Sequence, residues 1–339
     1  MKFLKYLLFL ILIAIIGFAI YVAVQPSEFE VERSRTVEVP AGVLYKNVID
    51  FKNWESWSAW VEKEPDLKIS YPEQTKGVGG SYSWEGKDGS GNMKTLAIEP
   101  NSSIDQELQF GDYHPSKIKW TFEPTEDNKT KVTWKMNGEK TPFMFKAFAL
   151  VSGGFDGMIG PDFERGLEKL DSIAVADIKK YTIKVDGITE HGGGYYLYNT
   201  TSCKMDEFKT KMVEMMPKLG EFVQKNNIAM AGAPFVSYHK WDEENNAVMF
   251  SCCVPTTSRV IAAESDILTG QLKPFKAVKT TLKGDYENLK QAWETGMKYV
   301  PENGLEFADN GPMIEAYLTD PTMESNPANW ITEIYLAVK

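Results

Sequence analysis

The sequence predicts an α+β protein in which one transmembrane helix precedes two folded domains. Three observations indicate this: a long apolar run lies near the N-terminus, a series of short alternating segments leads into one amphipathic helix, and the last part of the chain repeats itself. A length of 339 residues is also more than one hydrophobic core usually organises. We therefore expect a membrane anchor at residues 1–28, a first domain at 29–180 and a second domain at 181–339.

The expected membrane helix spans about residues 6–24, YLLFLILIAIIGFAIYVAV, an uncharged run of 19 residues. Such a run is long enough to cross a hydrocarbon core about 30 Å thick. Lys2 and Lys5 come before it and acidic residues follow from Glu28 onward, so the positive-inside rule predicts a cytoplasmic N-terminus in a bacterial inner membrane, with both domains on the extracytoplasmic (periplasmic) side. A cleaved signal peptide is the alternative, although the run is longer than a usual signal-peptide core and no clear small-residue cleavage site follows it.

Composition argues against several classes of partner and cofactor. The net charge of -10 disfavours binding to the phosphate backbone of nucleic acids. Three cysteines are too few for a disulfide framework, and the three histidines have no partners at metal-ligand spacing. Neither a Walker A loop nor the glycine motif of a dinucleotide-binding fold is present. We expect no metal, no cofactor and no nucleic-acid partner.

The first domain has the pattern of a helix-grip fold. A short strand comes first, and helical segments follow in PAGVLYKNVIDFKNWESWSAW. From Ile69 to Lys140 the chain alternates between apolar and polar residues and is broken by turn formers, which predicts an antiparallel meander. In the next segment, GGFDGMIGPDFERGLEKLDSI, apolar residues recur at steps of three and four, which predicts one long amphipathic helix.

Two motifs of this domain match a known superfamily. V-E-V-P-A-x-x-L-Y, D-F-x-N-W-x-x-W-S-x-W and the glycine-rich entry to the long helix resemble the SRPBCC (polyketide-cyclase-like, START-like) proteins. The resemblance implies an apolar cavity for a lipid, sterol or polyketide between the curved sheet and the long helix. Trp54, Trp57 and Trp60 either line the mouth of that cavity or pack on one face of the core, since steps of three fit both.

The second domain contains an internal repeat. Segments that begin with GYYLYNTTSCKMDEF and FKAVKTTLKGDYENL each follow the order strand, helix, proline-containing turn, strand, loop and strand. Asp206 and Asp285 stand at the expected helix starts, where acidic residues are typical N-caps. Neither half can bury its sheet alone, so we predict that the halves pair across a pseudo-twofold cleft.

The chain ends with NWITEIYLAVK, an apolar strand pattern with Glu333 in its middle. A carboxylate there is costly unless it has a partner or faces a wet or functional cavity. With E-A-Y-L-T-D-P at 315–321, this ending resembles the GyrI-like (AraC effector-binding) domain. The resemblance implies that Glu333 lies in a central ligand-binding cleft among aromatic residues, and some members hydrolyse strained small molecules with this acid. The expected ligand-binding residues are Glu333, Trp330, Tyr317, Tyr196, Tyr238, Trp293 and Glu315.

Three functional interpretations follow. In the first, the protein binds hydrophobic or cationic small molecules, because a carboxylate within aromatic rings attracts an organic cation. In the second, Glu333 is the catalytic acid or base of a hydrolase. In the third, both cavities are filled by side chains and the protein is an envelope scaffold. At single positions the sequence leaves alternatives, since Glu333 can also face solvent and Glu315 can also occupy a solvated edge.

Overall fold

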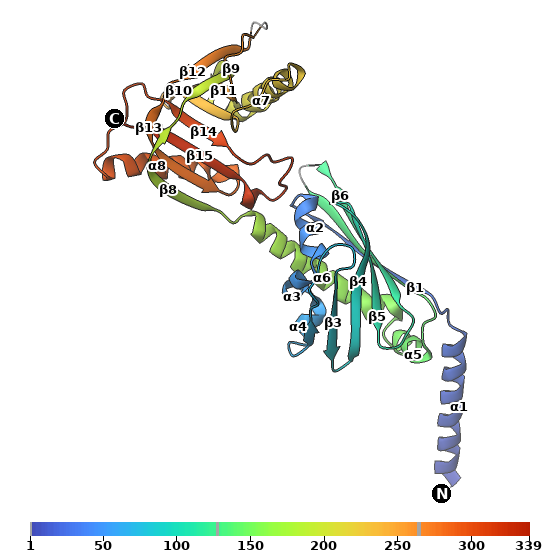
Figure 1. Cartoon of the computed structure of the whole chain (residues 1–339). Coiled ribbons are helices and arrows are strands. Elements are labelled where there is room, and N and C mark those ends of the chain that lie inside the picture. The colour runs from blue at the N-terminus through green and yellow to red at the C-terminus, as the bar shows by residue number, and fades with distance from the viewer. Residues whose placement is uncertain (1, 127–128, 263–265) are drawn as a thin grey trace. The chain divides into compact units, whose positions relative to one another are not determined.

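The computed structural model describes residues 2–126, 129–262 and 266–339. The chain forms two compact units, Met1–Asp177 and Ile178–Lys339. Each unit contains one antiparallel sheet and helices that pack on it (Figure 1). The predicted α+β class with two antiparallel sheets is confirmed.

The first unit consists of a curved sheet and the helices around it. Its helices are α1 (Lys2–Val24), α2 (Ala41–Ile49), α3 (Trp54–Trp57), α4 (Ala59–Lys63), α5 (Phe143–Val151) and α6 (Gly154–Ile178). Its strands are β1 (Phe29–Val37), β2 (Lys68–Ser70), β3 (Ser81–Gly86), β4 (Gly89–Glu99), β5 (Ser103–Phe110), β6 (Ser116–Pro124) and β7 (Thr130–Gly138). The strand order β1-β7-β6-β5-β4-β3-β2 pairs β2 to β7 in sequence order and adds β1 beside β7, which is the predicted meander.

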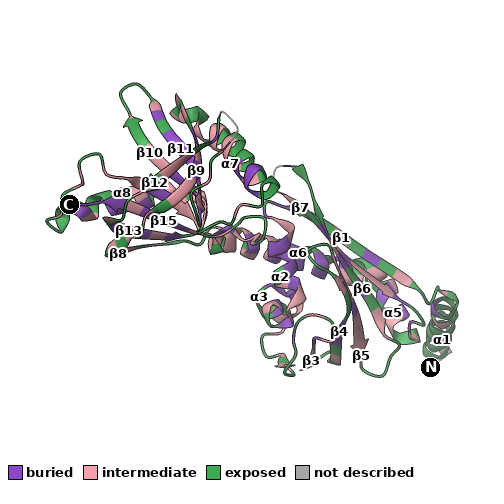
Figure 2. Ribbon diagram, turned by 45° about the horizontal axis from the view of Figure 1, so that its top comes forward, coloured by how far each residue is buried: buried purple, intermediate pink, exposed green. Residues whose placement is uncertain are grey.

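Helix α1 coincides with the apolar run. By length and composition alone, Phe3–Val24 is able to cross a membrane. Most of its side chains are exposed (Figure 2). Val22, near its end, is fully buried.

Helix α6 packs on the sheet through aromatic rings. The ring of Phe163 stacks on that of Trp134 with centroids 4.0 Å apart, and Trp134 stacks on Trp120 at 4.4 Å. Gly166 makes this close approach possible, because a Cβ atom there would lie 3.0 Å from the Trp134 ring. The predicted apolar stripe therefore forms the core of the first unit.

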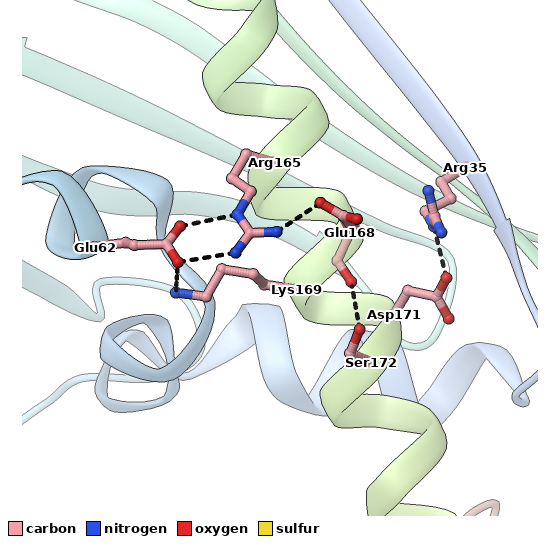
Figure 3. A network of polar contacts seen from close by, with 7 residues as sticks. All are labelled: Arg35, Glu62, Arg165, Glu168, Lys169, Asp171 and Ser172. Carbon is pink, nitrogen blue, oxygen red and sulfur yellow. Dashed lines mark hydrogen bonds and ion pairs between the residues drawn. The ribbon is translucent and has the colours of Figure 1, made fainter.

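Ion pairs hold α6 on both sides (Figure 3). Arg165 donates two hydrogen bonds of 2.9 Å to the carboxylate of Glu62 in α4. Arg35 of β1 donates one of 2.6 Å to Asp171. These side chains are partly exposed, so the pairs contribute more to the orientation of α6 than to stability.

Helix α5 was not expected from the sequence. Its nine residues, FMFKAFALV, form one apolar run interrupted by a single lysine. Periodicity alone cannot distinguish a helix from a buried strand in so short a run. The helix fills the connection between β7 and α6.

The second unit consists of an eight-stranded sheet and two helices. Its helices are α7 (Phe208–Lys225) and α8 (Leu289–Glu302). Its strands are β8 (Thr182–His191), β9 (Gly194–Lys204), β10 (Phe235–Asp242), β11 (Ala247–Thr256), β12 (Leu268–Leu272), β13 (Phe275–Lys283), β14 (Met313–Tyr317) and β15 (Ile331–Ala337). The strand order is β12-β9-β11-β10-β14-β15-β13-β8, with β10 and β14 at the centre.

Both helices of the second unit cover the same face of its sheet. Val236, Glu315 and Ile334 are neighbours across β10, β14 and β15, so their side chains point to one side. Val236 belongs to the apolar cluster that packs on α7, and Ile334 belongs to the cluster that packs on α8. Glu315 therefore lies on the helix-covered face, midway between the two helices.

The starts of the two helical segments differ from each other. Asp285 caps its segment as expected, since its side chain accepts a hydrogen bond from the Glu287 backbone N–H at 2.8 Å. Asp206 does not cap its segment, because it lies inside a short 3-10 turn whose N-cap is Lys204. The Glu207 side chain accepts a hydrogen bond from the Lys204 backbone N–H at 3.2 Å instead.

Candidate functional site

The first unit encloses a cavity of about 570 Å³. Its wall is formed by α3 and α4, residues from all seven strands, α5 and the start of α6. Much of the wall is apolar or aromatic, but charged side chains also line it, among them Glu55, Lys63, Glu64, Lys87, Asp88, Glu139 and Asp162. Such a cavity suits a hydrophobic molecule with a small polar part.

The three tryptophans at 54, 57 and 60 divide between the two expected roles. Trp57 is fully buried and its ring lies edge-on to Trp120 and Trp134, which is core packing. Trp54 and Trp60 line the cavity.

In the second unit, Glu315 is a buried carboxylate that aromatic side chains surround. It is 2% exposed and lies on β14, the short strand between β10 and β15. Its carboxylate accepts hydrogen bonds from Trp293 Nε1 at 2.6 Å, from the Tyr238 hydroxyl at 3.4 Å and from the Tyr317 hydroxyl. We call these four residues the Glu315 cluster. They come from β10, β14 and α8.

In the described part of the chain, no lysine, arginine or histidine neutralises Glu315 through an ion pair. Burial raises the pKa of Glu315 above the ordinary value of 4.5, although the three hydrogen bonds act in the opposite direction. Burial and the neighbouring carboxylate likewise raise the pKa of Tyr238 and of Tyr317. The three uncharged donors thus hold the Glu315 carboxylate in place but do not supply a positive charge that would balance it.

A second ring of side chains extends the aromatic wall. Tyr286 lies edge-on to Tyr317 with centroids 5.4 Å apart and packs on Trp330 at 4.8 Å. The sulfur of Met212 in α7 lies 3.3 Å from the Tyr317 hydroxyl, whose proton is donated to Glu315. All four side chains are partly exposed. Met212 adds an adaptable apolar surface.

Glu333 does not lie in this cluster, contrary to expectation. Its partner across the ladder is Ala316, whereas Glu315 pairs with Ile334, so the two carboxylates point to opposite faces of the sheet. Lys279 Nζ lies 3.0 Å from Glu333 and the Tyr335 hydroxyl donates to it at 2.5 Å. Glu333 is therefore a paired carboxylate on the face away from the helices.

The other expected ligand-binding residues also divide between the two faces of the sheet. Tyr238, Trp293 and Tyr317 contact Glu315, and Trp330 reaches the cluster through Tyr286. Tyr196 lies on the opposite face, where it packs on Phe235 and Tyr198. The sequence analysis missed Tyr286 as a wall residue, although its place directly after Asp285 at the start of a helical segment was a usable signal.

Titration of Glu315 yields a testable dependence of stability on pH. Because the folded carboxyl holds its proton more tightly than the unfolded one, its contribution to stability is complete below about pH 4.5 and is lost as the pH rises through the raised pKa. We expect the free energy of unfolding of wild type, relative to Glu315→Gln, to fall with rising pH in this window. Urea unfolding of both proteins at a series of pH values measures the difference, and a constant difference would contradict the raised pKa.

The described residues contain no group of three or more His, Cys, Asp or Glu side chains that could hold a metal ion. Cys252 and Cys253 are buried in β11, and burial raises the pKa of both thiols.

Two family models match the chain. Residues 195–339 match the GyrI-like small molecule binding domain. Residues 38–159 match the Activator of Hsp90 ATPase homolog 1-like protein, which is SRPBCC-like. No curated protein matches the sequence.

Several solved structures are similar to part of the chain. The C-terminal domain of EcmrR is 20% identical, with a TM-score of 0.41, and the match covers 47% of this chain and 98% of that one. An integron cassette protein of Vibrio cholerae is 16% identical, with a TM-score of 0.32 and coverage of 47% and 99%. SAV2435, solved bound to tetraphenylphosphonium, is 12% identical, with a TM-score of 0.35 and coverage of 47% and 94%. The chain thus carries an SRPBCC-like domain followed by a GyrI-like domain, in the order that the sequence predicts.

Proposed function

We propose that this chain is a membrane-anchored extracytoplasmic protein that binds small organic cations at the Glu315 cluster and hydrophobic molecules in the cavity of its first unit. One observation carries the proposal: Glu315 is buried, accepts hydrogen bonds from aromatic residues and has no ion pair within the described residues. The match to a small molecule binding domain over 195–339 supports a ligand site in this unit. The net charge of -10 further favours cationic ligands over nucleic acids.

Charge and ring geometry together distinguish a cation from a neutral molecule. A positive charge about 5 Å from the Glu315 carboxylate gains about 3 kcal/mol at an effective dielectric constant near 20. Each ring face within reach adds about 0.5–2 kcal/mol for a cation. A neutral molecule of the same shape gains neither contribution and retains only the apolar contacts.

The residues of the site have separate roles in this proposal. Trp293, Tyr238 and Tyr317 hold the carboxylate in place through their hydrogen bonds. Tyr286 and Met212 form the apolar wall against which the ligand packs. Glu315 provides the charge that selects the ligand.

Charge selectivity is the direct test of the ligand class. We expect the full chain in phospholipid nanodiscs at pH 7.5 to bind the cation N-methylacridinium at least about tenfold more tightly than neutral acridine, which has nearly the same shape. Fluorescence titration of both ligands measures the two dissociation constants. Equal affinities would refute recognition by a carboxylate.

The anchor is supported by the length and apolar composition of Phe3–Val24. We expect the full chain to stay in the membrane pellet after an alkaline carbonate wash, whereas a chain lacking residues 1–28 moves to the supernatant. In spheroplasts, added protease should degrade both units of the full chain. A protected or soluble full chain would contradict the proposed topology.

The cavity of about 570 Å³ argues against a scaffold whose interior is filled by side chains. The hydrolase alternative has less support than binding, because Lys279 and Tyr335 already engage the Glu333 carboxylate. Ligand binding is the function that the geometry supports best.

A further inference from the structure

Helix α5 carries an exposed apolar face. Four of its side chains, Phe143, Met144, Phe148 and Val151, are between 45% and 73% exposed. At 100° per residue, these positions fall within an arc of about 140° on one side of the helix. The helix contains one charged residue, Lys146, which is buried. The exposed side of α5 is therefore apolar along its whole length.

Helix α5 lies beside the end of α1. Lys146 Nζ donates a hydrogen bond of 2.9 Å to the backbone oxygen of Gln25, the residue after α1 ends. The backbone N–H and the hydroxyl of Thr141 both donate to the backbone oxygen of Ser27 at 2.9 Å. Helices α1 and α5 contact each other, and Figure 1 shows α5 near the end of α1 that leads into β1. These hydrogen bonds attach the start and one side of α5 to the residues that directly follow α1.

The opposite side of α5 faces the cavity of the first unit. Phe145 lines this cavity, and its ring lies edge-on to Tyr113 at 5.1 Å and to Phe110 at 5.8 Å. Helix α5 is therefore a thin wall with the cavity on one side and exposed apolar side chains on the other.

We propose that α5 lies in the outer interfacial layer of the same bilayer that α1 crosses, with Phe143, Met144, Phe148 and Val151 inserted among the lipids. This inference rests on the proposed membrane anchor. The length of α1 indicates that lipid covers the exposed face of α5. A hydrocarbon core about 30 Å thick is crossed by about 20 helical residues, so Val24 lies at the edge of the core and Gln25 in the interface. A helix bonded to Gln25 therefore lies at the level of the lipid head groups, where an apolar helix face is stable.

Nitroxide accessibility tests the proposal in the full chain. Cys252 and Cys253 are buried, so a Cys203→Ser background accepts a spin label at one introduced cysteine. Phe148→Cys and Val151→Cys report on α5 and Ile13→Cys reports on α1. Val78→Cys is the matched control, because Val78 is a 55% exposed residue of the same unit away from α5. Electron paramagnetic resonance saturation in phosphatidylcholine nanodiscs compares collisions with oxygen, which partitions into lipid, and with a polar nickel chelate.

We expect labels at 148, 151 and 13 to collide at least several-fold more with oxygen than with nickel relative to the label at 78. If 148 and 151 behave like 78 while 13 remains in lipid, the anchor stands and the role of α5 is wrong. If 148 and 151 are shielded from both reagents, a protein contact covers this face and the proposal is also wrong. If 13 is accessible to nickel, the anchor fails and the inference fails with it.

Discussion

Replacing Glu315 by glutamine is expected to weaken binding of N-methylacridinium by roughly 100-fold and to leave acridine binding unchanged. Glutamine keeps the shape and one acceptor oxygen but removes the charge, which we estimate contributes about 3 kcal/mol to cation binding. Fluorescence titration at pH 7.5 measures both affinities. The same substitution removes a buried charge, so it should not lower the stability of the second unit at this pH.

Glu333→Gln is the matched control for that substitution. Glu333 lies on the neighbouring strand but on the opposite face of the sheet, and it already has Lys279 as its partner. We expect its loss to leave the affinity for the cation within about twofold of wild type. A large loss in Glu333→Gln with little change in Glu315→Gln would move the site to the other face and overturn the assignment.

Trp134→Ala is expected to lower the free energy of unfolding of the first unit by about 3–5 kcal/mol, which is the usual cost of removing a large buried aromatic side chain. Trp134 is 1% exposed and lies between Trp120 and Phe163, so its loss separates α6 from the sheet. Urea unfolding, followed separately for each unit by hydrogen–deuterium exchange of its peptides, measures the change. The second unit serves as the internal reference.

Trp241→Ala is the matched control, because it makes the same substitution at an exposed tryptophan. Trp241 is 54% exposed, so its truncation should change the free energy of unfolding by less than about 0.5 kcal/mol. If Trp134→Ala were equally harmless, the aromatic stack would not hold α6 on the sheet, and our description of the first unit's core would be wrong.

The fold class and the order of the two domains follow from patterns that are local in the sequence. The alternating segments became β3 to β7, and the apolar stripe of the long helix became α6. Helix α5 could not be predicted in this way, because an apolar run of nine residues does not show whether it forms a helix or a buried strand. Local patterns thus predicted the strands of the meander and helix α6, but they did not predict helix α5.

The position of the carboxylate could not be predicted from local patterns. Glu315 and Glu333 both lie in apolar strand segments, and the face that each occupies depends on how β14 and β15 align. A shift of one residue in that register would exchange their faces. The lysine that pairs with Glu333 is 54 residues away in sequence, and no local signal indicates it.

Glu315 and its aromatic partners were all among the expected residues, but the sequence did not indicate which of the two carboxylates the aromatic rings surround. Tyr238, Trp293 and Tyr317 are large residues at strand or helix positions that favour the interior, and all three contact Glu315. Tyr196 fits the same pattern but lies on the other face. Residue type therefore predicted that these side chains are buried, whereas the strand register determines on which face of the sheet each ring lies.

The Trp293 indole provides the most direct measurement of where a cation binds. Its N–H donates to Glu315 at 2.6 Å, so a cation beside that carboxylate must change its resonance. We would label the tryptophans with 15N, assign Trp293 by Trp293→Phe, and follow all indole resonances during titration with N-methylacridinium. The account predicts a saturable shift of Trp293 while Trp54 and Trp60 in the cavity of the first unit stay unchanged. A shift confined to Trp54 and Trp60 would place the cation in that cavity and contradict the account.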